Sequence, residues 1–242
     1  MPGANPRSAN GGAGHSIRQF RGTTIVDALR YFGLLLLLTL QAGIANAEWS
    51  GISLNLGNSD VDWKFRDEVR EAQISEISFQ IEDRTDSGLS VGANIGYMDL
   101  RVVADTDIAT RKFNGQFVGI YLRQDYSITE NMSLHGIFGF RYSSGNESGD
   151  SDIDSDIDWT ETGFEFGIGF RFVNLRIMPF AAWSDVDGDI SGGDDGTSIF
   201  ELEDPLTRGI RFDLFVERTA FVRLEFVDGS RNGVYLVFAR RY

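Results

Sequence analysis

The sequence predicts an all-β protein, an antiparallel transmembrane up-and-down β-barrel of ten strands. Three observations support this fold class. After residue 47 the chain is a series of segments, each about ten residues long, in which every second residue is apolar, as strands with two unlike faces require. The connections between these segments alternate between short and long. A secretory leader precedes the segments, and the last of them is rich in aromatic residues.

The leader is expected to be a cleaved signal peptide. Arg18, Arg21 and Arg30 form a basic segment, and the apolar run Phe32–Leu40 follows them. This run is too short to span a bilayer as a helix, which needs about 20 residues. The tripeptide Ala-Asn-Ala at 45–47 matches a cleavage site of the small-residue type.

Cleavage at this site would divide the chain into a leader with an N-terminal extension, residues 1–47, and a single barrel domain, residues 48–242. Residues 1–17 are longer and more polar than a leader requires, and a start codon assigned upstream of the true one would explain them.

The composition is acidic and contains no cysteine. The chain carries 22 basic and 36 acidic residues, a net charge of −14, and four of the basic residues lie in the leader. Such acidity argues against nucleic acid or anionic lipid as a partner. The absence of cysteine means that no disulfide stabilises the fold, although an oxidising compartment would be tolerated.

Five segments in the first half of the barrel domain show the alternation. The first three place apolar residues at every second position, with polar residues or glycine between them. The fourth is apolar on both faces, so its facing stays open. The fifth follows a tight turn and carries aromatic residues on one face. The predicted strands are Trp49–Gly57, Gln73–Glu82, Leu89–Val103, Lys112–Gln124 and Met132–Tyr142.

Five further segments follow in the second half. The sixth is the most regular, with five apolar residues, four of them phenylalanine, alternating with polar residues and glycine. The seventh contains Pro179, which cannot donate a ladder hydrogen bond and predicts a local bulge or an early end. The eighth and ninth alternate apolar with charged residues. These strands are Thr160–Phe172, Asn174–Trp183, Leu206–Val216, Ala220–Val227 and Gly233–Tyr242.

The lengths of the connections orient the barrel. Short joins are expected at 83–88, 125–131, 173–174 and 217–219, whereas 58–72, 104–111, 143–159 and 184–205 are expected as long polar loops. Bacterial barrels have short periplasmic turns and long outer loops, so both termini are predicted to be periplasmic. An eight-strand barrel is the alternative, if the seventh segment or the last hairpin does not contribute to the wall.

The C-terminal segment and one turn carry a family resemblance. Gly233, Leu236, Phe238 and Tyr242 are similar to the terminal assembly signal of outer-membrane barrels, although leucine replaces an aromatic residue at 236. Residues 125–134 resemble a periplasmic turn of the same proteins. The chain as a whole resembles the small OmpA-, Opa- and OmpW-like barrels. The resemblance implies a monomer in the Gram-negative outer membrane, recognised by the barrel assembly machinery and in contact with lipid and lipopolysaccharide. It implies no particular activity.

Charged residues on the strands are expected to face the lumen. A charge that faces the bilayer midplane costs about 2–4 kcal/mol, so the apolar face of each strand should face lipid. The inward charges then either pair with one another and plug the lumen, or line a narrow gated pore. The network is expected to contain Arg211, Asp213, Arg223, Glu225, Arg171, Glu165, Arg141 and Glu82.

Two of the predicted outer loops are rich in aspartate. Carboxylate oxygens suit Ca²⁺ or Mg²⁺. Three interpretations are open: a specific calcium site, loose divalent bridging to lipopolysaccharide phosphates, and a solvated surface loop. The candidate cation ligands are Asp152, Asp154, Asp156, Asp158, Asp185, Asp187 and Asp189, and no metal site with a defined ligand set is predicted.

No catalytic residue is predicted. His135 is the single histidine after the leader, and it is expected to be a lumen-facing structural residue, despite its closeness in sequence to Ser133. Aromatic belts are expected from Trp159 and Trp183 at the outer rim and from two tyrosines, Tyr126 and Tyr242, at the inner rim. The sequence favours a structural or surface-interaction protein without a cofactor. A narrow channel for small solutes or cations is the alternative, and an outer-leaflet lipid hydrolase is the third hypothesis.

Overall fold

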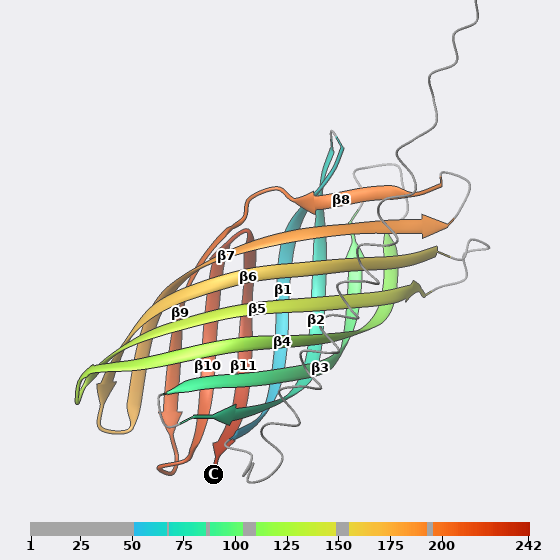
Figure 1. Ribbon diagram of the computed structural model, residues 1–242. Coiled ribbons are helices and arrows are strands. Elements are labelled where there is room, and N and C mark those ends of the chain that lie inside the picture. Colours follow the sequence, from blue (N-terminus) through green and yellow to red (C-terminus); the bar gives the residue numbers. More distant parts are fainter. Residues whose placement is uncertain (1–50, 67, 86–87, 104–109, 149–154, 193–195) are drawn as a thin grey trace, which may run out of the picture. The chain divides into compact units, whose positions relative to one another are not determined.

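The computed structural model describes residues 51–66, 68–85, 88–103, 110–148, 155–192 and 196–242 (Figure 1). The chain divides into two compact units, residues 1–47 and 48–242, and the second unit contains every described residue. The predicted signal peptide lies outside the described residues. No helix in the described part of the chain is long and apolar enough to cross a membrane.

The described residues form an eleven-stranded antiparallel sheet. Each strand alternates inward and outward side chains, as the sequence pattern predicts. The strands are β1 (Gly51–Phe65), β2 (Glu68–Arg84), β3 (Leu89–Val102), β4 (Arg111–Thr129), β5 (Met132–Glu147), β6 (Ser155–Phe172), β7 (Leu175–Gly192), β8 (Ser198–Leu202), β9 (Leu206–Phe215), β10 (Ala220–Gly229) and β11 (Arg231–Arg241).

The sheet closes on itself as an up-and-down barrel. Strands β1 to β7 pair in chain order, β7 pairs with β9, and β9, β10 and β11 follow in order. The last strand returns to the first, with pairs from Gly51 and Arg241 to Val61 and Arg231. This ring contains ten strands, all of which correspond to predicted segments, so the ten-strand fold class is confirmed.

Strand β8 was not predicted. It pairs with the end of β7, from Asp187 to Ile190, and with β1 at Trp63 and Lys64. Figure 1 shows β8 running beside the end of β7. The β10–β11 hairpin is shorter than its neighbours, and the backbone N–H of Ser230 in its turn donates to the carbonyl of Leu206 at 2.9 Å. Beyond this hairpin the wall therefore consists of β1 to β8.

The two ends of the barrel differ. We call the end with Gly51 and Arg241 the terminal end, and the opposite end, where β8 lies, the distal end. Short turns at the terminal end join β4 to β5, β6 to β7 and β9 to β10, where the sequence predicts short joins. The prediction of long polar loops at the distal end is wrong for 58–72, 143–159 and 184–205, because strand residues occupy much of each range.

The direction of the alternation explains this error. In the terminal part the apolar side chains face outward, as at Leu54, Phe79 and Val118, which are exposed. In the distal part the alternation continues but the apolar side chains face inward, as at Val61 and Trp63, which are buried. In the distal part, polar side chains occupy the positions that are apolar in the terminal part. The sequence therefore resembles a polar loop there, although the strand continues.

The distal lumen is consequently filled by a hydrophobic core. Side chains from β1 to β4 and from β6 to β8 contribute to it. Its buried members are Val61, Trp63, Phe65, Ala72, Ile74, Met98, Leu100, Val102, Phe113, Phe117, Ile157, Trp159, Val186, Ile190 and Phe200.

The open question about β4 is resolved by the same analysis. Val118 and Leu122 are exposed on the outer wall, whereas Phe117 is buried inside. Tyr121 also faces inward, and a Cβ atom at Gly92 on β3 would overlap its ring. Glycine at 92 therefore makes room for the tyrosine in the lumen.

Pro179 does not have the predicted effect. The β6–β7 pairs continue from Gly167 and Phe180 to Phe170 and Ile177 without a change of register, and only the two positions between them lack pairs. Strand β7 goes on to Gly192, so the strand neither bulges nor ends early at the proline. The missing N–H donor interrupts the ladder locally, as expected for proline.

Candidate functional site: the barrel lumen

The lumen of the terminal part is crossed by layers of ion pairs. Nearest the terminal end, Asp213 lies between two arginines on neighbouring strands and is fully buried. The Arg176 Nε donates to Asp213 Oδ2 at 2.8 Å, and the Arg223 Nε donates to Asp213 Oδ1 at 2.6 Å. Arg223 and Asp213 are direct partners across β9 and β10.

A second carboxylate at the same level also serves two arginines. Glu82 Oε1 accepts a hydrogen bond from Arg123 Nη2 at 2.5 Å and lies 3.7 Å from Arg241 Nε. Arg123 Nε lies 3.4 Å from Asp125 Oδ2. Of these residues only Glu82 belongs to the network that the sequence predicts, and Arg123, Asp125, Arg176 and Arg241 are additional members. The alternation along β4 would have identified the first two, since both have the inward parity of Tyr121.

The next layer is centred on Arg211, which is buried and bound by two glutamates. Its Nε donates to Glu225 Oε2 at 2.5 Å, and its Nη2 donates to Glu165 Oε2 at 2.6 Å. The guanidinium also lies over the ring of Phe180, 4.1 Å from its centroid. These contacts bring together three residues of the expected network.

His135 lies between the first two layers. Its Nδ1 is 2.6 Å from Asp125 Oδ1, so the ring donates to the carboxylate, and its Nε2 is 3.5 Å from Glu165 Oε1. The side chain is buried. The ring is therefore anchored to Asp125 through Nδ1, whereas Nε2 is buried beside Glu165 without a hydrogen bond to a described residue.

A third layer lies toward the distal core. Arg141 Nη1 is 2.8 Å from Glu76 Oε2, and Arg231 Nη2 is 3.1 Å from Glu161 Oε2. The Arg141 guanidinium stacks on Phe117, 3.6 Å from the ring centroid, which joins this layer to the core. The sequence predicts a lumen position for Arg141, but Glu76, Glu161 and Arg231 are not among the predicted network residues.

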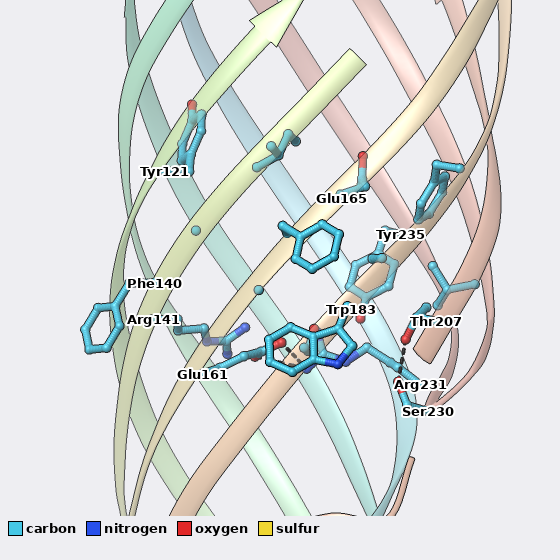
Figure 2. A pocket seen from close by; sticks show the side chains of 18 of the residues that line it. Tyr121, Phe140, Arg141, Glu161, Glu165, Trp183, Thr207, Ser230, Arg231 and Tyr235 are labelled. Atoms are coloured by element: carbon cyan, nitrogen blue, oxygen red, sulfur yellow. Dashed lines mark hydrogen bonds and ion pairs between the residues drawn. The ribbon is translucent and has the colours of Figure 1, made fainter. Parts of the chain in front are cut away.

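A cavity of about 300 Å³ lies along the second and third layers. Figure 2 shows Arg141, Glu161 and Arg231 at one level of this cavity. Gly139, Gly163 and Ala182 line it from β5, β6 and β7, and their small side chains leave the space open. The lining combines these charged side chains with apolar ones such as Ile137 and Phe180.

On the distal side the aromatic residues of the core close the lumen. Trp63 stacks on Phe200 with ring centroids 4.3 Å apart, and Trp159 meets Trp63 edge-on at 5.4 Å. The expectation that Trp159 belongs to an outer-rim belt is therefore wrong, because its ring points inward and is buried. Trp183 faces outward and stacks on Phe164, with ring centroids 5.9 Å apart.

Arg171 stands apart from the network in which it was expected. It is exposed at the terminal end and lies directly opposite Arg176 on β7. Within the described part of the chain it makes no ion pair, and its Nε donates to the carbonyl of Val173 at 3.5 Å. Its guanidinium lies 4.7 Å from the centroid of the Phe215 ring.

Five of the seven aspartates proposed as cation ligands lie in the described part of the chain, and all five belong to strands, not to loops. Asp156 and Asp158 belong to β6, and Asp185, Asp187 and Asp189 belong to β7. Asp152 and Asp154 lie outside the described residues. Among the residues that the structure describes, no group of three or more His, Cys, Asp or Glu side chains could hold a metal ion.

These strand aspartates face outward beyond the apolar belt and form like-charge pairs. Asp158 lies directly opposite Asp189, and Asp187 lies opposite Glu201. Partial burial, together with the charges of Asp158 and Asp187, raises the pKa of Asp189 above its ordinary value. Like charges directly opposite each other destabilise a sheet, so this acidic surface is maintained at a cost in stability.

The residues of the predicted assembly signal lie on β11 or directly after it. Leu236 and Phe238 have the outward parity, and Phe238 is exposed on the outer wall. Gly233 packs against β1, where a Cβ atom would meet Ser59 at 2.7 Å. Tyr242 ends the chain and is exposed at the terminal end, as is Tyr126.

Taken together, the wall and the lumen define the class of protein. A closed antiparallel barrel with an apolar outer belt and charged residues inside is the architecture of a chain that crosses an outer membrane with strands. The outward belt includes large exposed side chains on all ten strands of the ring, among them Leu54, Phe79, Ile95, Leu122, Phe138, Phe164, Trp183, Leu214, Phe226 and Phe238. The chain is a transmembrane β-barrel of the outer-membrane type.

Comparisons with known proteins find barrels of this type. The chain is similar to the translocator domain of the autotransporter NalP from Neisseria meningitidis, with 12% identity and a TM-score of 0.46, covering 89% of this chain and 98% of that one. It is similar to the outer membrane protease OmpT from Escherichia coli, with 10% identity and a TM-score of 0.47, covering 80% and 96%. It is also similar to the outer membrane protein OprG from Pseudomonas aeruginosa, with 10% identity and a TM-score of 0.43, covering 80% and 98%. No protein-family model and no curated protein matches the sequence.

Proposed function

We propose that the protein is a non-conducting, monomeric barrel of the Gram-negative outer membrane that anchors an acidic surface for interactions outside the cell. In this proposal the terminal end is periplasmic and the distal end is extracellular. The observation that carries it is the aromatic core that fills the distal lumen, in which Trp63 and Phe200 are each 1% exposed.

Two closures in series support the absence of conduction. An ion that enters the distal lumen would have to leave water among tryptophan and phenylalanine rings, and an unpaired ion in such surroundings costs many kcal/mol. Below this core, the layers centred on Arg211 and on Asp213 hold charged side chains against one another across the lumen. Barrels of about this strand number have interiors just wide enough for side chains to fill.

The outward face of the distal part supports a role at the surface. Its aspartates on β6 and β7 lie beyond the apolar belt, where they would meet the lipopolysaccharide headgroups or the medium. Divalent cations would bridge such carboxylates to lipopolysaccharide phosphates, so loose cation bridging is part of the proposal. The strands hold the aspartates in a fixed array, which favours a defined contact surface.

We propose no enzymatic activity. The Nε2 of His135 faces Glu165 at 3.5 Å, and a histidine that activates a serine would direct this nitrogen at the hydroxyl. Replacement of His135 by alanine should therefore change barrel stability without abolishing any hydrolysis of lipid or peptide. A hydrolytic activity that disappears in this variant would contradict the proposal.

The cavity is the one observation that favours the alternative, a narrow channel for small solutes or cations. It provides about 300 Å³ of space within the lumen, lined by charged and apolar side chains. A channel would need the aromatic core and the Arg211 layer to move aside, and both consist of residues fixed by stacking or by paired hydrogen bonds.

Conductance in planar bilayers distinguishes the two functions. The refolded barrel, shown to be inserted by its heat-modifiable migration on gels, is expected to give no stable single-channel steps. The variant Arg208→Gln, which changes an exposed arginine outside the lumen, is the matched control and should also be silent. Stable steps that vanish when Arg211 or Glu225 is neutralised would establish the channel instead.

A further inference from the structure

The terminal end of the lumen carries an excess of positive charge. Five arginines with inward parity meet there with three carboxylates, those of Glu82, Asp125 and Asp213. With all of these groups ionised, the five arginines and three carboxylates carry a net charge of +2, and the neighbouring Arg211 layer, with two glutamates for one arginine, carries −1. The five residues, which we call the arginine cluster, are Arg123, Arg171, Arg176, Arg223 and Arg241.

Each of two carboxylates at this end, Asp213 and Glu82, is shared by two arginines, so there are more N–H donors than carboxylate oxygens to accept them. Asp213 binds both Arg176 and Arg223. Arg171 lies directly opposite Arg176, so two positive charges are adjacent. Of the two arginines, only Arg176 pairs with a carboxylate among the described residues, that of Asp213. The Nε of Arg123 is buried and forms no hydrogen bond with a described residue, although it lies 3.4 Å from Asp125 Oδ2. Buried donors without partners are costly, so a ligand that accepts hydrogen bonds would be favoured here.

Aromatic rings hold the arginines in place against their mutual repulsion. The guanidiniums of Arg171 and Arg176 lie 4.7 and 5.9 Å from the centroid of the Phe215 ring. Those of Arg223 and Arg241 lie 5.4 and 5.5 Å from the Phe221 ring. When the flat face of a guanidinium lies against a ring, its N–H groups point outward in the guanidinium plane, where they can bind an acceptor such as an anion.

A small cavity borders the cluster. It has a volume of about 50 Å³ and is lined by Arg123, Arg223 and Arg241 of the cluster, by the carboxylate of Glu82, and by polar side chains that include Ser53 and Gln80. Arg171 and Arg176 lie outside its lining. The arginine fork matches the oxygen spacing of phosphate. Cation binding is disfavoured at the same place by the arginines.

We propose that the arginine cluster is a phosphate-binding site at the terminal end of the lumen. The bound group is either free phosphate or the phosphate of a lipid headgroup at the adjacent membrane surface. Arg171, which is exposed and unpaired, makes the first contact, and the buried arginines complete the binding. The site requires only that the barrel is closed. A result on conductance therefore neither supports nor contradicts phosphate binding.

The test is calorimetric titration of inorganic phosphate into the full barrel domain, refolded in an uncharged detergent that contains no phosphate. Ionic strength is held constant with chloride. Saturable binding is expected, weakened about tenfold or more in Arg171→Gln, because at least one charged hydrogen bond is lost. Arg208→Gln, which removes an exposed arginine outside the cluster, is the control and should bind as the unaltered protein does.

Lipid competition distinguishes the two sources of phosphate. If a headgroup occupies the site, phosphate should bind more weakly to the barrel in phosphatidylglycerol nanodiscs than in detergent, and equal binding identifies free phosphate as the ligand. Absence of saturable binding in detergent overturns the proposal, as does unchanged binding by Arg171→Gln. Because Arg171 makes no ion pair, this variant should fold, and its heat-modifiable migration verifies that it does.

Discussion

At the scale of single residues, the lumen is organised by carboxylates and arginines that serve more than one partner. Arg211 binds Glu165 and Glu225, and Asp213 binds Arg176 and Arg223. Removal of Arg211 or of Asp213 therefore leaves two charged groups without this shared partner in the interior of the barrel. The energetic consequence is the penalty for an uncompensated buried charge, which exceeds the net contribution of any one ion pair.

Asp213 provides the most direct test at this scale. Replacing it by alanine should lower the free energy of unfolding by about 3–5 kcal/mol, because Arg176 and Arg223 would stay buried without their carboxylate. Urea unfolding in lipid vesicles measures the change.

The control is Asp228→Ala, which removes another aspartate bound to an arginine of β9. The Asp228 and Arg208 side chains are 61% and 77% exposed, so the loss should be about 0–1 kcal/mol. Equal losses in the two variants would show that the lumen is as well hydrated as the surface.

At the scale of elements, strand β8 converts a ten-strand wall into an eight-strand wall at the distal end. It does so by pairing with both β7 and β1 above the shorter β10–β11 hairpin. Its inward residue Phe200 completes the stack with Trp63. A strand of five residues thus closes the aromatic core from one side.

Phe200→Ala tests the contribution of this strand. The variant should lose about 3–5 kcal/mol of unfolding free energy, the usual effect of truncating a buried phenylalanine. The tryptophan fluorescence should also shift to longer wavelength, because Trp63 would lose its stacked neighbour. Ile199→Ala, at the adjacent outward position that is 48% exposed, is the control and should leave the spectrum unchanged.

The acidic surface of β6 and β7 predicts a pH-dependent effect. At pH 7, Asp189→Asn should stabilise the barrel by about 0.2–1 kcal/mol, because it removes a like charge opposite Asp158. The folded state raises the pKa of Asp189 above the ordinary value of 3.8. The stability that depends on its protonated form is therefore complete below pH 3.8 and is lost as the pH rises through the raised pKa.

Unfolding measured between pH 3 and pH 8 should show the advantage of Asp189→Asn disappearing at the acidic end. Asp185→Asn changes an aspartate of the same outward face that lies opposite Thr162, and it should be nearly neutral at every pH. An Asp189 variant whose advantage did not vary with pH would mean that the Asp158 charge is screened in the folded barrel.

At the scale of the whole molecule, the lumen is closed twice by different chemistry. The distal closure is an apolar core, and the terminal closure is a set of charged layers with a cavity adjoining them. The two closures share few residues, so weakening one should leave the other in place. The molecule should therefore resist opening by any single substitution.

Phe200→Ala also tests this double closure. The variant weakens the aromatic core, yet the layers of Arg211 and Asp213 should keep the lumen shut, and planar bilayers should show no conductance. Steps that appear on this single substitution would show that the aromatic core is the sole barrier to ions.

The sequence by itself determined the strands of the barrel wall and the lipid-facing side of their terminal parts. Both follow from local information, namely an apolar residue at every second position and turn residues between segments. It also placed Arg211, Asp213, Arg223 and Glu225 on neighbouring strands, because consecutive strands of a barrel pair in order.

Only the tertiary structure decided the partners across the lumen and the fold of the distal end. Glu76 meets Arg141, and Glu161 meets Arg231, only because closure and stagger bring β2 near β5 and β6 near β11. The apolar side chains of Trp63 and Trp159 point inward, whereas aspartates of β6 and β7 lie on the outer face of the distal wall. Alternation shows that a strand has two faces, but what each face meets depends on how the whole sheet closes.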